Sequence, residues 1–301
     1  MKNRRRLPSE VWGSNEPAGQ QNDGGRMMKT IVAALICLLT FASSFADEPS
    51  PDVEKGRRER LELMKGVVDD VSLETSDEPP KRLTRSENPV LRYTNPVTSA
   101  FSEGALFLWL DGKRPLAAVS PSLRDNGTIW WELTSLSDGP LRLTRDGAVV
   151  WQPKSCSRKA ELLKDVPAPA ESTAARLTQF RAIARKFQVR EERRGGWQEG
   201  RLLSQPLYRW NDDKAGVIDG ALFGYAETTD PELLLMIEAR RDSVTREARW
   251  YFTLAKMTSS PMTVSLNEQE IWSVEGYWKN PRAPTDPYVE AAIGKFDPAA
   301  R

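Results

Sequence analysis

The chain has 301 residues, with 43 Lys and Arg against 42 Asp and Glu, two Cys and no His. Without histidine, Ser-His-Asp and Cys-His catalysis, His-ligated zinc and haem with a His ligand are excluded. The near-neutral balance argues against a nucleic-acid protein, which carries a basic excess or a basic stripe. A hydrophobic share of 39% is typical of a globular chain, and the length allows one large domain or two ordinary ones.

Residues 27–46 have the order of segments found in a secretory signal peptide. Lys29 precedes an apolar run at 31–39, and the small residues Ser44 and Ala46 follow at the positions of a cleavage site. The apolar run is shorter than the about 20 residues that cross a bilayer. We therefore predict cleavage after Ala46 and export to the periplasm or the extracellular space. An uncleaved membrane anchor is the alternative.

Residues 1–26 are polar, rich in turn-forming residues and without an apolar period. Signal peptides begin just before their charged region, and Met27 supplies such a beginning. We therefore predict that residues 1–26 are an extension ahead of the true start. The mature chain begins at Asp47 and keeps only Cys156, so it has no internal disulfide and we expect an ordinary loop thiol.

An internal correspondence runs through the mature chain. Gly104–Phe107 recurs as Gly220–Phe223, an offset of 116 residues that later becomes 121. Further matches, in the same order, are Pro115 with Pro231, Arg124 with Arg240, Trp130 with Tyr251, and Val150-Trp151 with Ile271-Trp272. We predict two tandem copies of one unit, over residues 47–165 and 166–275, followed by an irregular C-terminal tail over 276–301.

Each copy is expected to contain one helix followed by an antiparallel sheet. Apolar residues three or four apart predict helices over 57–68 and 172–189, the second capped by Ser172. Alternating or continuous apolar runs predict strands at 105–110, 116–119, 128–136, 141–144, 148–151, 233–237, 248–255 and 263–266. These patterns predict an α+β fold of two helix-plus-sheet units, β-rich overall.

Carboxylates, Lys and Tyr are the remaining acid–base candidates. The carboxylates considered are Asp111, Asp138, Asp146, Asp213, Asp219, Asp230 and Glu238. Paired carboxylates serve glycoside hydrolysis, but an Asp before Gly is first of all a turn residue. A carboxylate-dependent hydrolase acting on glycans is therefore kept as the alternative function.

Aromatic and arginine side chains are the candidates for ligand binding. Trp197, Tyr277 and Trp278 lie outside the repeated strands, where exposed rings could stack on sugars. Arg92 and Arg209 occupy matched positions beside an aromatic residue and could hold an acidic partner; a cation–π contact or a strand-edge ion pair is the alternative. The sequence contains no phosphate loop, dinucleotide fingerprint, CxxC motif or calcium loop, so we predict no cofactor and no metal.

Several phrases resemble those of a family of signal-bearing exported proteins of planctomycete-type bacteria. They are NPVLRYTNP, GALFLWLDGKRPLAA, ELTSLSDGPL, QPLYRW, DGALFGYAETTDPELLLMIEAR and WSVEGYWKNPRAPTDPYVE. The resemblance covers most of residues 85–290, implies a cell-envelope or exported setting, and carries no activity or site residues to this chain. Together these features predict a non-catalytic, exported envelope protein that binds a partner protein or a polysaccharide, but no nucleic acid.

Overall fold

The computed structural model describes residues 51–95, 101–242, 245, 247–276 and 283–296. The chain divides into two compact units, Met1–Glu48 and Pro49–Arg301, and every described residue belongs to the second. The expected extension, the signal peptide and its cleavage at Ala46 therefore lie outside the described residues and stay predictions. In the described part of the chain, no helix is both long enough and apolar enough to cross a membrane.

Strands dominate the fold, with 53% of the described residues in strands and 14% in helices. The predicted α+β class with two helix-plus-sheet units is therefore wrong: the fold is β-rich, built from curled antiparallel sheets. Two helices occur among the described residues, α1 (Pro51–Asp69) and α2 (Thr173–Ala184). Each helix covers part of one sheet. Strands that the sequence patterns did not predict extend the sheets well beyond the part that a helix covers.

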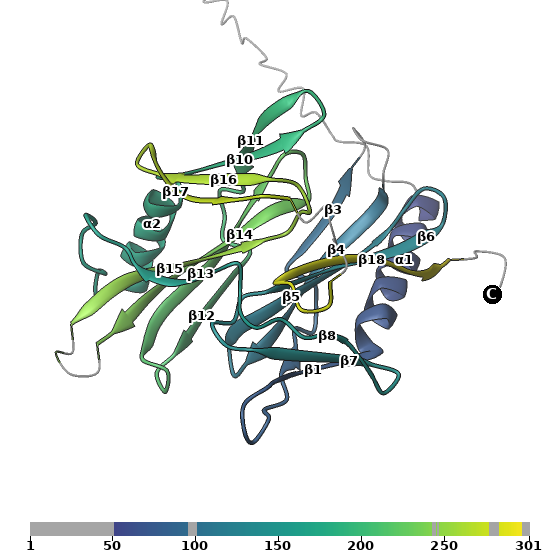
Figure 1. Cartoon of the computed structure of the whole chain (residues 1–301), viewed down its shortest axis with the longest axis horizontal. Helices are drawn as coiled ribbons and strands as arrows, with labels where there is room; N and C mark the ends of the chain where they lie inside the picture. Colours follow the sequence, from purple (N-terminus) through teal and green to yellow (C-terminus); the bar gives the residue numbers. More distant parts are fainter. Residues whose placement is uncertain (1–50, 96–100, 243–244, 246, 277–282, 297–301) are drawn as a thin grey trace, which may run out of the picture. The chain divides into compact units, whose positions relative to one another are not determined.

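Within the described residues the strands form three sheets (Figure 1). The first has the order β1-β7-β8, with β1 (Val71–Thr75), β7 (Leu141–Arg145) and β8 (Ala148–Trp151). The second has the order β18-β6-β5-β4-β2, with β3 also paired to β4; its strands are β2 (Thr84–Arg85), β3 (Leu91–Asn95), β4 (Phe101–Asp111), β5 (Arg114–Leu123), β6 (Thr128–Ser135) and β18 (Tyr288–Lys295).

The third sheet is the largest and has the order β17-β16-β10-β11-β13-β14-β15-β9, with β12 also paired to β13. Its strands are β9 (Arg158–Leu162), β10 (Phe187–Arg193), β11 (Gly196–Leu202), β12 (Tyr208–Asp212), β13 (Val217–Ala226), β14 (Pro231–Arg241), β15 (Ala248–Lys256), β16 (Met262–Leu266) and β17 (Gln269–Val274). All of its pairings are antiparallel.

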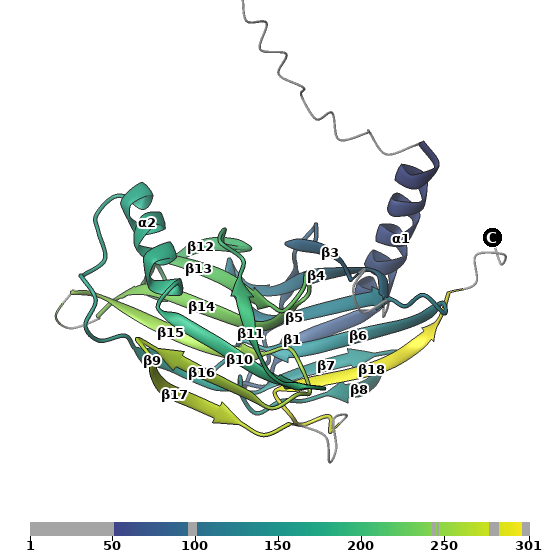
Figure 2. The ribbon, with the colours of Figure 1, turned by 90° about the horizontal axis from the view of Figure 1, so that it is seen from above.

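Two strands cross between the halves of the chain. Strand β9 follows the strands of the first half but pairs with β15 of the second half, and β18 follows the second half but pairs with β6 of the first (Figure 2). The segment expected to be an irregular tail therefore includes a sheet strand. Because each half receives an outer strand from beyond its own boundary, the halves are not two self-contained tandem units.

The central strands are apolar on both faces because both faces are buried. In β4, Ala105 and Phe107 belong to the core beneath α1, while Leu106 and Leu108 belong to a cluster shared with the second half. Strand β14 alternates in the same way, with Leu235 in the core beneath α2 and the next residue in the shared cluster. This double burial produces the continuous apolar runs in the sequence.

Helix α2 begins where its cap predicts and ends earlier than its apolar pattern does. The Ser172 side chain accepts a hydrogen bond from the amide of Ala175 at 3.2 Å, which confirms the predicted N-cap. The helix ends at Ala184, and Phe187 and Val189 are buried from strand β10 instead. A short buried strand continued the apolar pattern of the helix, so periodicity alone could not place the boundary.

Two matched glycines lie directly beneath aromatic rings. A Cβ on Gly104 would come within 2.4 Å of the Tyr93 ring, and one on Gly220 within 2.2 Å of the Trp210 ring. Both rings are buried. The recurring Gly-Ala-Leu-Phe phrase therefore begins with glycine because an aromatic side chain of the neighbouring strand occupies the space of a Cβ.

Candidate functional site

A cavity of about 690 Å³ lies where the second and third sheets meet. Its wall draws on β5, β6 and β18 from one sheet and on β10, β14 and the loop before β16 from the other. This volume falls within the about 300 to 1,000 Å³ of typical small-molecule sites. The cavity is therefore the candidate ligand site.

The wall of this cavity carries more acidic than basic groups. Among the described residues that line it, six are carboxylates and three are arginines. The carboxylates are Glu132, Glu192, Glu227, Asp230, Glu232 and Glu290. The arginines are Arg124, Arg193 and Arg194. The rings of Trp130 and Pro261 and the hydroxyl groups complete the wall; the hydroxyls are those of Ser122, Thr258, Ser259, Ser260 and Tyr288.

On the wall formed by the second sheet, two glutamates share one tyrosine hydroxyl. Glu132 of β6 and Glu290 of β18 are direct cross-strand partners, a position where two like charges repel. The Tyr288 hydroxyl lies 2.7 Å from Glu132 Oε1, to which it donates, and 3.2 Å from Glu290 Oε2. Burial, with added repulsion from Asp230 and Glu290, raises the pKa of Glu132 to about 8. At neutral pH Glu132 is therefore mostly protonated.

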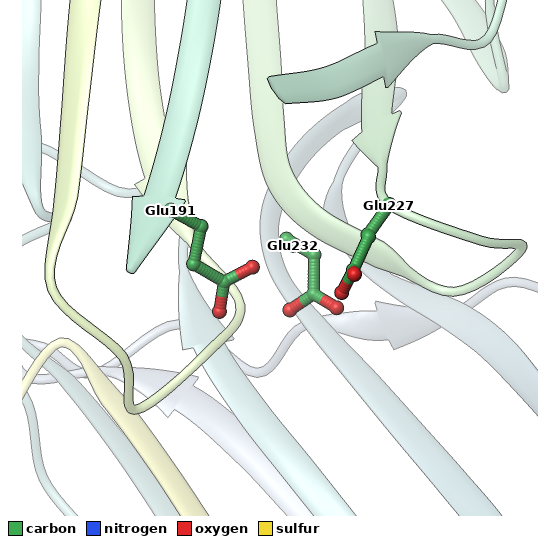
Figure 3. Close-up of side chains that lie close together, drawn as sticks. All are labelled: Glu191, Glu227 and Glu232. Carbon is green, nitrogen blue, oxygen red and sulfur yellow. The ribbon is translucent and has the colours of Figure 1, made fainter. Parts of the chain in front are cut away.

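On the opposite wall, three glutamates surround one arginine. Glu191, Glu227 and Glu232 point toward one another (Figure 3) and have carboxylate oxygens within 4.8 Å of each other. The Arg193 guanidinium lies 3.1 Å from Glu191, 3.3 Å from Glu227 and 2.5 Å from Glu232. We call these four residues the Arg193 cluster.

The Arg193 cluster is costly to bury. Glu191 and Glu232 are only 4% and 7% exposed. Burial raises the pKa of both carboxyls, and for Glu232 the negative charge of Glu191 adds to the increase. The oxygen spacing alone would suit a metal ion, but the Arg193 guanidinium already balances the same three carboxylates. The residues present therefore fit a guanidinium better than a metal.

Another ion pair between the halves shows how this interface can be closed without a cavity. Arg114 at the start of β5 reaches Glu238 of β14 with two hydrogen bonds of 2.8 and 3.1 Å. Arg240 also binds Glu238 and lies over the Tyr251 ring, 5.0 Å from its centroid. Burial alone would raise the pKa of Glu238, but the hydrogen bonds and charges of Arg114 and Arg240 lower it below its ordinary value.

The matched positions line the cavity with smaller side chains. At the offset of 116 residues, Asp230 stands in place of Arg114 and Ser122 in place of Glu238. Arg124 lies 4.4 Å from the centroid of the Trp130 ring, just as Arg240 lies over Tyr251. A long bidentate pair is thus replaced by a short acid and a hydroxyl, and this loss of side-chain volume accounts for the open space.

Three carboxylates of the site, the buried Glu191 and Glu232 and the half-buried Glu132, match neutral residues in the other half of the chain. Glu132 matches Thr253 at the offset of 121, while Glu191 matches Thr75 and Glu232 matches Leu116 at the offset of 116. All three neutral residues are buried. The other half of the chain therefore packs neutral side chains at these positions. Because a buried carboxylate lowers stability, core packing does not explain the three carboxylates of the site.

Arg92 and Arg209, predicted as ligand-binding residues, hold the two helices to their sheets. Glu103 of β4 accepts from Arg92 at 2.8 Å and from Arg60 of α1 at 2.9 Å. Asp219 of β13 accepts from Arg209 at 2.6 Å and from Arg176 of α2 at 2.9 Å. The arrangement matches the strand-edge ion pair that the sequence left open as the alternative, and neither arginine lines the cavity.

The other predicted ligand-binding residues are also apart from the cavity or undescribed. Trp197 is 40% exposed on the β10–β11 hairpin and does not line the cavity. Tyr277 and Trp278 lie outside the described residues. Of the candidate carboxylates, Asp230 lines the cavity, whereas Asp219 and Glu238 are bound by arginines. Cys156 is buried, and burial raises its pKa to about 12, as befits an unreactive thiol.

Sequence reasoning missed most of the site. Glu132, Tyr288, Glu191, Arg193 and Glu232 were not among the predicted residues. A signal was present in the matched positions, since a carboxylate in one half corresponds in sequence to a neutral residue in the other half. This difference indicates a functional site only when the carboxylate is known to be buried, because an exposed carboxylate needs no explanation.

The comparisons with known proteins do not identify the site. No protein-family model matches the chain, and neither curated proteins nor solved structures give a significant match. The proposals below therefore rest on the geometry of the described residues.

Proposed function

We propose that this is an exported, non-catalytic binding protein of the cell envelope, and that its ligand occupies the cavity between the second and third sheets. One observation carries the proposal: at the positions matched to Arg114 and Glu238, the interface is left open by Asp230 and Ser122. It is lined by carboxylates of which Glu232 is buried and Glu132 and Glu290 are half-buried. Those carboxylates lower the stability of the fold, and ligand binding is the benefit that explains them.

The wall selects a small polar molecule with hydrogen-bond donors. Carboxylates and hydroxyls accept hydrogen bonds, and these groups outnumber the guanidinium donors around the cavity. The volume of about 690 Å³ suits a small solute or the end of a longer chain. Export, which the signal-peptide pattern predicts, would expose this cavity to solutes and polymers of the envelope.

A carboxylate-dependent hydrolase acting on glycans is the second candidate. The observation in its favour is the Glu132–Tyr288–Glu290 contact, which places a carboxyl that is protonated at neutral pH beside a second carboxylate in a cavity. Binding is preferred because burial and mutual repulsion already explain the raised pKa of Glu132, with no catalytic step required.

Native mass spectrometry after incubation with a small-molecule extract of the producing cells tests the binding function. We expect one retained small molecule, which a Ser122→Trp variant loses because the indole fills the cavity. Val149→Trp, at an exposed position of β8, is the matched control and retains the ligand. Equal retention by the wild type and Ser122→Trp would contradict the proposal.

Turnover separates the two candidates. The binding function predicts no release of reducing sugar from a panel of envelope glycans. Release that disappears in Glu132→Gln, with glycan binding retained, would replace it with the hydrolase.

A further inference from the structure

We infer that the cavity binds an organic amine cation, a linear molecule with ammonium or guanidinium groups toward its two ends. This inference rests on the proposed binding function and names its ligand class. The geometry behind it is a cavity with carboxylates on two facing walls, in a protein that already holds guanidinium groups on carboxylates at the same interface.

The two walls offer two separate anchor points. Glu132 and Glu290 lie on β6 and β18 of the second sheet, while Glu192 of β10 and Asp230, just before β14, line the wall of the third sheet outside the Arg193 cluster. One cationic group of the ligand is placed at each wall. The apolar middle of such a molecule then lies between them, near the Trp130 ring.

The protein itself shows what this interface accepts. At one position the Arg114 guanidinium makes two hydrogen bonds to Glu238, and at the cavity the Arg193 guanidinium contacts three carboxylates. Where Arg114 closes the interface, its matched position in the cavity is Asp230. A cation supplied from solution would thus take the role that an arginine side chain plays at the other position.

A ligand of another class satisfies fewer of these groups. An inorganic divalent ion would have to displace Arg193 from its three carboxylates. An anion would meet a wall with twice as many carboxylates as arginines. A neutral sugar would donate hydrogen bonds to the carboxylates but would bring no positive charge to them.

Isothermal titration calorimetry at pH 7.5 and low salt tests the ligand class. The probes are agmatine and putrescine, with cellobiose, citrate and calcium chloride in parallel. We expect agmatine or putrescine to bind, and the dissociation constant to rise at least about tenfold in Glu132→Gln and in Asp230→Asn. Glu270→Gln, an exposed change on β17, is the matched control and leaves binding unchanged. Thermal unfolding of each variant verifies that it is folded.

The outcomes separate the ligand class from the proposed function. Binding of cellobiose, citrate or calcium that Ser122→Trp abolishes would overturn the amine class but support the cavity as a binding site. Binding of agmatine that is unchanged in Glu132→Gln and Asp230→Asn would place the amine elsewhere and overturn the inference. If none of the five probes binds, the amine class is overturned, and the retained-ligand experiment alone decides the binding function.

Discussion

At the scale of single residues, the clearest consequence concerns Glu132. A glutamate in the unfolded chain ionises near its ordinary value of 4.5, whereas in the folded protein the pKa of Glu132 is about 8. Between these values the unfolded chain has released the proton that the folded protein keeps. The contribution of Glu132 to stability is therefore favourable below pH 4.5 and is lost as the pH rises toward 8.

Glu132→Gln is expected to stabilise the protein at alkaline pH. The amide cannot ionise, yet it still offers an oxygen to the Tyr288 hydroxyl. We expect a gain on the order of 3 kcal/mol at pH 8 and little change at pH 4.5. Thermal unfolding at both values measures it, with the exposed Glu270→Gln as control. A loss of stability at pH 8, or an equal gain at both pH values, would show that burial does not raise this pKa.

The glycines beneath aromatic rings give a second residue-scale prediction. In Gly220→Ala the new methyl group would lie 2.2 Å from the buried Trp210 ring, so strand or ring must shift. We expect a loss of about 1 to 3 kcal/mol in the free energy of unfolding. Gly294→Ala, on β18 with no atom within 4 Å of the new Cβ, is the control, measured by the same urea titration. Equal effects of the two changes would contradict the packing argument.

At the scale of elements, the local patterns were predictable and the long-range pairings were not. Ser172 caps α2 as predicted, and Asp146 and Gly147 both have the positive φ of the hairpin turn expected between β7 and β8. Neither β10 nor β18 was predicted as a strand. Strand β10 pairs with its neighbour β11 and with the distant β16, and β18 pairs with the distant β6. A pattern local to a strand contains no information about a distant partner.

Strand β18 is expected to be as important as any central strand of the second sheet. Val289 is 5% exposed and belongs to the core beneath α1, although more than one hundred residues separate it from its partner strand. Val289→Asp should cost about 3 kcal/mol, because it places a carboxylate in that core. Ala292→Asp, on the exposed part of the same strand, should change stability by less than about 0.5 kcal/mol.

Urea unfolding of the two variants measures the difference. If Val289→Asp unfolds at the same urea concentration as Ala292→Asp, β18 contributes nothing to the core and the pairing with β6 is wrong.

At the scale of the whole molecule, the matched contacts of the two halves explain both the fold and the site. The helix anchors Arg60 and Arg176, bound to Glu103 and Asp219, lie at the same offset of 116 residues as their acidic partners. Duplication of an ancestral unit remains a prediction, but matched positions already show where the halves differ. The replacements named above, such as Asp230, Ser122 and Glu132, lie around one cavity. They could not be singled out before burial and cross-half contacts were known.

The central claim is that this cavity binds an organic amine cation between carboxylates on its two walls, one of which is Glu132. Its most direct test is proton release during agmatine binding, measured calorimetrically at pH 7 in buffers of different ionisation enthalpy. The ionised form of Glu132 is favoured beside a cation, so we predict release of about one proton per agmatine bound. Binding whose heat is independent of the buffer, or binding with proton uptake, would contradict the account.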